Sequence, residues 1–154
     1  MRYYNAISKG YDALHAQEQL AKAALIKEHA CLRGLLLDIG AGTGITTREF
    51  RQQALCIALD PCREMLQHFN GLAVVGRAEQ LPFKSSSFDS VISITALHHA
   101  DLAKAKKEIA RVAKQQAAIA VSFFKRAGNF SQAAEIFRNF RQIDSEKDVI
   151  FVKK

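Results

Sequence analysis

A short apolar run that leads into a glycine-rich turn is the feature of this 154-residue chain that most restricts its fold. The run occupies residues 35–39, the turn reads Gly40-Ala41-Gly42-Thr43-Gly44, and residues 43–53 have the composition of a helix. Glycines in such a turn adopt positive φ and let a ligand approach the backbone, while the following helix offers free N–H groups. The sequence therefore predicts a buried strand, a ligand-binding turn and a helix in succession.

The same alternation of strand-like and helix-like segments continues along the chain and predicts an α/β fold. Further strands are expected at 55–59, 72–75, 88–94 and 117–124, and further helices at 13–33, 61–69, 101–113 and 131–140. Pro61 suits the first turn of its helix, and Ser131 is expected to cap the last one. Segments 140–143 and 149–152 flank a polar turn and predict a hairpin. We expect a doubly wound, mostly parallel sheet of about seven strands, with helices on both faces and a C-terminal antiparallel hairpin.

Size and composition indicate one domain, residues 1–154, in which residues 1–33 form an N-terminal helical segment. No apolar run approaches the ~18 residues that cross a bilayer. The first residues also lack the apolar segment of a secretory signal, so we expect no membrane association and a cytoplasmic location. Cys31, Cys56 and Cys62 include no C-x-x-C pair, so neither a disulfide framework nor a metal site is expected.

Positive charge is concentrated in the second half of the chain. Of the formal net charge of +7, residues 77–154 carry +6. A basic half is compatible with RNA, an anionic metabolite or an acidic protein as partner. A solvated basic surface explains the charge at least as well, because no Arg-rich cluster and no aromatic-spaced RNA motif accompanies it.

An acidic residue follows the glycine turn at a separation that indicates a nucleoside site. Asp60 stands twenty residues after Gly40, at the end of the second predicted strand, where a carboxylate accepts hydrogen bonds from both ribose hydroxyls. The Gly-x-Gly-x-Gly spacing differs from the Gly-x-Gly-x-x-Gly of dinucleotide sites. Asp38, directly before the turn, suits an ammonium or sulfonium better than a pyrophosphate. A nucleoside with a cationic tail therefore fits this site better than NAD.

Taken in order, the motifs resemble those of the class I S-adenosylmethionine-dependent methyltransferases. The similarity is greatest to the type found in ubiquinone and menaquinone biosynthesis, the methyltransferase type 11 family. It is carried by Tyr11-Asp12, the turn from Asp38 to Gly44, Ala58-Leu59-Asp60, Arg77-Ala78-Glu79-Gln80-Leu81-Pro82-Phe83, Ser87-Phe88-Asp89-Ser90-Val91-Ile92-Ser93, Leu97-His98-His99 and Lys107-Glu108-Ile109-Ala110-Arg111-Val112. The resemblance implies a Rossmann-like fold and S-adenosylmethionine as cofactor.

The resemblance also implies roles at the matching positions. The methionine part of the cofactor would lie over Gly40, Ala41, Gly42 and Gly44, with Asp38 orienting the turn and the ammonium. Asp60 would bind the ribose, Pro61 or Cys62 would contact the adenine face, and the backbone of Ala78 would meet the adenine edge. Leu97 would lie where the transferred methyl points. Tyr11 belongs to the N-terminal segment, residues 1–33, which covers the cofactor in relatives.

Two departures from the family pattern stand out. The family usually has Asp, which accepts from the adenine amino group, where this chain has the donor Arg77, so the contact is expected to pass either to Glu79 or to water. Relatives usually carry Lys-Pro-Gly-Gly before the fifth strand, and this chain has Lys114-Gln115-Gln116-Ala117. The second difference affects loop geometry more than chemistry.

The methyl acceptor is less constrained than the cofactor. No Asn-Pro-Pro-Tyr follows the fourth predicted strand, which disfavours amino nitrogens of bases or glutamine. His98 or His99 is a candidate general base and Tyr11 a further catalytic candidate, although for either histidine we favour a role in capping or lining the loop. We favour O- or C-methylation of a small metabolite. The alternatives are an RNA or protein methyltransferase completed by a homodimer or an activating partner subunit, and a cofactor-binding module without catalysis.

Overall fold

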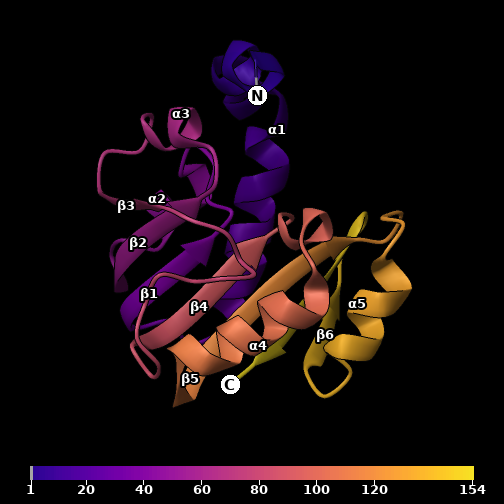
Figure 1. Cartoon of the computed structure of the whole chain (residues 1–154). Coiled ribbons are helices and arrows are strands. Elements are labelled where there is room, and N and C mark those ends of the chain that lie inside the picture. The colour runs from indigo at the N-terminus through magenta and orange to yellow at the C-terminus, as the bar shows by residue number, and fades with distance from the viewer. Residues whose placement is uncertain (1) are drawn as a thin grey trace.

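The computed structural model describes the backbone of residues 2–154 and the side chains of residues 16–154. Its elements are α1 (Arg2–His29), β1 (Gly34–Ile39), α2 (Ile45–Glu49), β2 (Ala54–Asp60), α3 (Arg63–Leu66), β3 (Leu72–Val75), β4 (Phe88–Ile94), the 3-10 helix η1 (Leu97–His99), α4 (Leu102–Val112), β5 (Ala113–Phe124), α5 (Phe130–Ile136), β6 (Arg141–Asp144) and β7 (Asp148–Lys153). The strands form one sheet in the order β3-β2-β1-β4-β5-β7-β6 (Figure 1).

The sheet has the predicted mixed pairing. β3, β2, β1, β4 and β5 run parallel, while β7 pairs antiparallel with both β5 and β6. β1 lies between β2 and β4, so the strand order reverses beside β1. Open α/β sheets bind ligands at the carboxyl ends of the strands next to such a reversal. The glycine turn follows β1 and therefore lies at this position.

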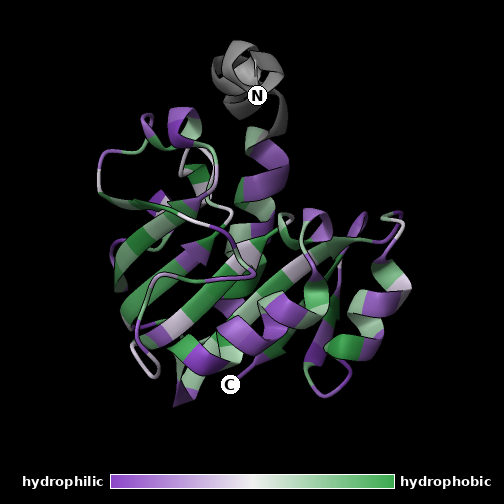
Figure 2. Ribbon diagram, in the orientation of Figure 1, coloured by the Kyte–Doolittle hydropathy of each residue, from purple (hydrophilic) through white to green (hydrophobic). Residues whose placement is uncertain are grey.

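Helices cover both faces of the sheet because successive side chains of each strand point to opposite sides. Leu36 packs with Ile26 of α1, whereas the next residue, Leu37, belongs to the cluster that contains Ile109 of α4 and Phe137, the C-cap of α5. Figure 2 shows hydrophobic residues concentrated in the strands, with hydrophilic residues on the outer side of α4. The doubly wound Rossmann-like prediction is confirmed.

Several predicted helix boundaries are wrong. The helices expected at 43–53 and 61–69 are reduced to α2 and α3, and Pro61 lies before α3, whose N-cap is Cys62. Ser131 lies inside α5, whose N-cap is Asn129. Residues 76–87, all of which are described, contain no helix. None of the described helices combines the length and apolar composition that crossing a membrane requires.

The altered segment before the fifth strand is part of that strand. β5 begins at Ala113, directly after α4, and extends through Lys114-Gln115-Gln116. The pairing of β5 with β4 shifts register between Phe88 and Ser90. The strand thus reaches the sheet through an irregular extension, where relatives are expected to use a glycine turn.

Candidate functional site: a nucleoside cavity at the ends of β1 and β2

The glycines of the turn are required by backbone conformation and by contacts within the protein. Gly40 and Gly44 both have φ 75°, a value that side-chain-bearing residues rarely adopt. A Cβ on Gly40 would stand 2.2 Å from the Cβ of Ala96, and one on Gly44 would stand 2.2 Å from Cδ2 of Phe69. The turn can therefore approach the segment after β4 and the end of the α3 region only with glycine at these positions.

The carboxylate of Asp60 ties the turn to the end of β2. Its Oδ2 accepts from the backbone N–H of Gly42 at 2.9 Å, and its Oδ1 accepts from the N–H of Cys62 at 2.8 Å. The N–H groups of Gly40 and Ala41 bond the carbonyl of Leu59 at 2.7 and 3.0 Å. Burial raises the pKa of Asp60, and the two backbone hydrogen bonds oppose that rise. Each carboxylate oxygen has a further lone pair available for a ligand hydroxyl.

Asp38 lies beneath the turn. It is 1% exposed, and the hydroxyl of Thr47 donates to its Oδ2 at 2.6 Å. Burial raises the pKa of Asp38 to about 7, against the hydrogen bonds from Thr47 and Thr46, and the nearby charge of Asp60 adds to the rise. Asp38 therefore supports the turn from inside the protein.

A cavity of about 150 Å³ opens at the carboxyl ends of β1, β2 and β4. Five residues predicted to bind the cofactor line it: Gly40, Pro61, Ala78, Glu79 and Leu97. Six lining residues were not predicted for this role: Ile39, Leu59, Arg77, Ala96, His99 and Ala100. Four of them, Ile39, Leu59, Arg77 and Ala96, directly precede a residue that was predicted to bind the cofactor. This adjacency to the predicted residues was the signal available in the sequence.

The other predicted residues lie beside this cavity or outside the described side chains. Asp38, Ala41, Gly42, Gly44, Asp60 and Cys62 belong to the turn and its supports, and none of them is part of the cavity lining. The side chain of Tyr11 lies outside the described residues. Its predicted contact with the cofactor stays a prediction.

Glu79 and Arg77 both line the cavity but meet different environments. Oε1 of Glu79 accepts from the backbone N–H of Asp101 at 3.1 Å, directly before α4. Arg77 is exposed, and an isolated bridge pairs it with Gln80. Glu79 therefore has an acceptor oxygen at the cavity wall, consistent with the predicted substitution for the family's Asp.

His99 is part of the cavity lining, and the neighbouring His98 is not. The two imidazole centroids are 3.9 Å apart, and His98 also makes an edge contact with Phe124. Nδ1 of His98 is buried and has no hydrogen-bond partner among the described residues. Burial lowers the pKa of His98, and the neighbouring His99 and Lys22 lower it further. Both effects favour the neutral form of the imidazole.

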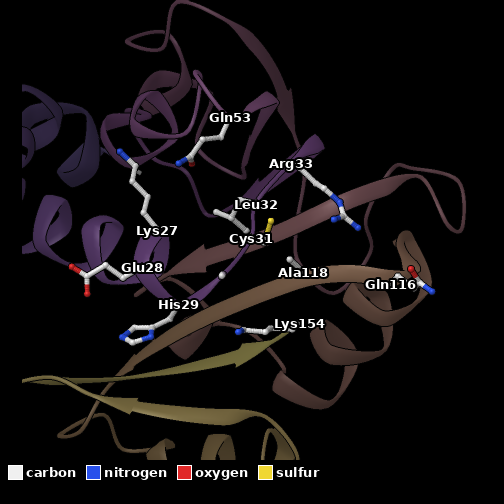
Figure 3. A pocket seen from close by; sticks show the side chains of 11 residues that line it. Lys27, Glu28, His29, Cys31, Leu32, Arg33, Gln53, Gln116, Ala118 and Lys154 are labelled. Carbon is white, nitrogen blue, oxygen red and sulfur yellow. The ribbon is translucent and has the colours of Figure 1, made fainter.

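A second cavity, of about 580 Å³, lies away from the glycine turn, beside the end of α1 and the start of β5 (Figure 3). Lys27, His29, Arg33 and Lys154 give its lining a basic character, with Glu28 as the acidic member. None of the predicted cofactor-binding residues lines it. Its size alone therefore does not make it the nucleoside site.

The apolar walls of the smaller cavity and the acceptor carboxylate beside it fit part of an adenosyl nucleoside. Apolar side chains such as Leu59 and Leu97 provide walls for a base, and the carboxylate of Asp60 stands beside them at the end of β2. A volume of about 150 Å³ is below the ~300–1,000 Å³ of typical ligand pockets. The cavity as it stands thus has room for only a portion of such a nucleoside.

Sequence comparison identifies the family. The model of the methyltransferase-domain family matches residues 37–121, more than half of the chain. The uncharacterized protein MJ1252 of Methanocaldococcus jannaschii is 34% identical over 116 residues, which cover 73% of this chain and 46% of that protein. A demethylmenaquinone methyltransferase of Corynebacterium glutamicum is 37% identical over 94 residues, 58% of this chain and 41% of that enzyme. The chain thus spans less than half the length of these two curated relatives.

Solved structures agree on the fold. YcgJ of Bacillus subtilis superposes with a TM-score of 0.69 at 26% identity, covering 83% of this chain and 71% of that one. The complex of the Haloferax volcanii Trm112 methyltransferase activator contains a chain with a TM-score of 0.71 at 21% identity, covering 92% and 76%. The DhpI complex with SAH gives a TM-score of 0.75 at 16% identity, covering 98% and 92%. Together with the family match, these likenesses establish that the chain belongs to the methyltransferase-domain family and has the class I S-adenosylmethionine-dependent methyltransferase fold.

Proposed function

We propose that the protein transfers a methyl group from S-adenosylmethionine to a small-metabolite acceptor, at oxygen or carbon. The observation that carries this proposal is the cavity at the ends of β1 and β2, where the Asp60 carboxylate holds the glycine turn by the N–H of Gly42. When bound, the cofactor supplies a sulfonium whose methyl group is open to in-line displacement. The similarity to the C. glutamicum demethylmenaquinone methyltransferase supports a small-molecule acceptor.

The protein's part in this reaction is mainly to hold and align the two reactants, which accounts for several orders of magnitude in such displacements. Asp60 would hold the ribose, the Gly40 turn would lie against the methionine part, and Leu97 would border the methyl. His98, whose pKa is lowered mainly by burial, is our candidate base for an acceptor that enters protonated, and His99, which lines the cavity, is the alternative. We also propose that residues 1–33, including Tyr11, cover the site.

Thermal unfolding with and without cofactor tests this function. S-adenosylmethionine at a hundred times its Kd should stabilise the protein by ~2.7 kcal/mol, which is roughly 5–10 °C in Tm for a chain of this size. NAD at the same concentration should leave the Tm unchanged, because the turn has the wrong spacing for a pyrophosphate. Stabilisation by NAD without any by S-adenosylmethionine would reject the proposal.

As a second candidate, we propose that a partner subunit docks on the β2–β3 edge and completes the acceptor site. Leu55, Leu72 and Val75 are 61%, 52% and 54% exposed on these two strands. β3 is an edge strand with unpaired backbone groups, and the described residues 76–87 supply no helix to cover it. The structural neighbour complexed with the Trm112 activator supports the idea of a partner. A large acceptor such as RNA would also suit the basic cavity of Figure 3.

The Leu72→Glu variant tests the docking edge. Because Leu72 is half-exposed, the substitution should change the free energy of unfolding by less than ~0.5 kcal/mol. The variant should no longer bind the protein partner that co-purifies with the wild type. Light scattering and mass spectrometry of the purified proteins measure this loss of binding. Ser85→Glu, which adds the same single negative charge at an exposed position in the loop before β4, is the matched charge control. A wild type that purifies as a monomer without bound protein contradicts the docking proposal.

A further inference from the structure

A buried lysine joins α1 to the segment that follows β4. Lys22 is 3% exposed, and its Nζ lies 3.0 Å from Oδ2 of Asp148 at the start of β7. The same ammonium donates to Oγ1 of Thr95 at 2.7 Å and lies 4.6 Å from the centroid of the Phe124 ring. The ammonium of this α1 residue therefore contacts three segments that are distant from it in sequence: the residue after β4, the end of β5 and the start of β7.

Thr95 has a backbone conformation that its side chain disfavours. Its φ is 53°, in the left-handed region that β-branched residues avoid. Holding a residue there costs about 1–3 kcal/mol, so surrounding contacts must enforce it. Its N–H donates to Oγ of Ser122 at 2.9 Å, its Oγ1 lies 3.2 Å from the same hydroxyl, and Lys22 supplies the third contact.

The direction of the chain after Thr95 determines part of the nucleoside cavity. The next two residues, Ala96 and Leu97, both line it. Ala96 also packs closely against the glycine turn, because a Cβ added to Gly40 would overlap the Cβ of Ala96. A change of φ at Thr95 would therefore move this wall relative to the turn.

We propose that Lys22 is a positioning residue for the cofactor cavity, holding Thr95 in the left-handed conformation that places Ala96 and Leu97 against the glycine turn. The proposal rests on the proposed function for the identity of the ligand. Anchoring α1 to the sheet does not by itself require a charge, because buried ion pairs are often replaced by apolar residues without loss of stability. The ammonium is distinguished from an apolar anchor by its hydrogen bond to Thr95.

Two variants separate positioning from stability. Thr95→Val keeps the shape and the Lys22–Asp148 pair but removes the oxygen that accepts from Lys22. Lys22→Met/Asp148→Val removes both buried charges together, which avoids leaving one of them unpaired. Each should keep a cooperative unfolding transition while weakening S-adenosylhomocysteine binding about tenfold, or about 1.4 kcal/mol, by calorimetry. Lys27 lies on the same helix as Lys22 and makes a partly exposed ion pair with Glu49 of α2. Its replacement by Met removes that ion pair and should leave the affinity unchanged.

The outcomes are decisive in either direction. If Thr95→Val and, where it folds, the charge-pair variant both bind like the wild type, Lys22 is only an anchor and the proposal is overturned. The backbone amide signal of Gly40 in the NMR spectrum gives a readout without ligand, since Gly40 packs on Ala96 and not on Lys22. It should shift in Thr95→Val and not in Lys27→Met, and an unshifted signal overturns the proposal. Failure of the wild type to bind S-adenosylhomocysteine would instead reject the proposed function, while the Gly40 signal still tests the positioning.

Discussion

Replacing Asp60 with alanine is expected to weaken S-adenosylmethionine binding about a hundredfold, equivalent to about 2.7 kcal/mol. The carboxylate has two tasks in the structure. It accepts from the N–H groups of Gly42 and Cys62, and it presents its remaining lone pairs beside the cavity. Alanine leaves both backbone donors without their charged acceptor and removes the proposed ribose contact, and hydrogen bonds to charged groups contribute about 1.5–3 kcal/mol each.

Calorimetric titration of Asp60→Ala and Asp60→Asn measures the two tasks separately. Asparagine keeps one acceptor oxygen, so its loss of affinity should lie between those of the wild type and Asp60→Ala. Glu64→Gln, a neighbouring carboxylate whose Oε2 lies 3.5 Å from Sγ of Cys62, is the matched control and should bind normally. An Asp60→Ala protein with undiminished affinity would show that the nucleoside binds elsewhere.

The first four strands were predictable because each is a short apolar run. Residues 35–39, 55–59, 72–75 and 88–94 were all located within one residue of the observed β1–β4. The bounds of the short helices α2 and α3 were not predictable, because the ends of these helices depend on tertiary contacts. Gly44 is left-handed at the start of α2, and Phe50, fully buried, lies just after its end. Helix-forming composition in 43–53 gives no sign of either constraint.

The site shows the same division between local pattern and tertiary structure. Sequence spacing placed Asp60 and the glycine turn at adjoining strand ends, since parallel strands present their carboxyl ends at one edge. It did not reveal that Asp60 binds the turn itself, or that Asp38 is buried beneath it. The contact between Lys22 and Asp148 joins residues that are far apart in the chain, and neither stands in a recognisable motif.

The buried Asp38 predicts an unusual dependence of stability on pH. Its pKa is raised from 3.8 to about 7 in the folded protein, mainly by burial. The folded state therefore keeps a proton that the unfolded chain releases above pH 3.8. The contribution of Asp38 to the free energy of unfolding is fully present below pH 3.8 and is lost as pH rises to about 7. Relative to Asp38→Asn, the wild type should lose about 3 kcal/mol between pH 5 and pH 8.

Denaturant unfolding of both proteins at these two pH values measures that difference. Asparagine can still accept the hydrogen bond from Thr47, so the comparison changes the charge and little else. Glu49→Gln, an exposed carboxylate on α2, is the control and should track the wild type at both pH values. Equal pH dependence in the wild type and Asp38→Asn would show that Asp38 does not hold the proton.

The same proton connects Asp38 to the cofactor. A cationic ligand over the glycine turn favours the carboxylate form of the aspartate beneath it, so its binding should lower the pKa of Asp38 and release a proton near pH 7. S-adenosylmethionine should therefore bind more tightly as pH rises from 6 to 8, and calorimetry in buffers of different ionisation enthalpy should detect the released proton. Asp38→Asn should bind without proton release. If the wild type also binds without releasing a proton, the cation of the cofactor lies too far from Asp38 to affect it, and Asp38 serves only to support the turn.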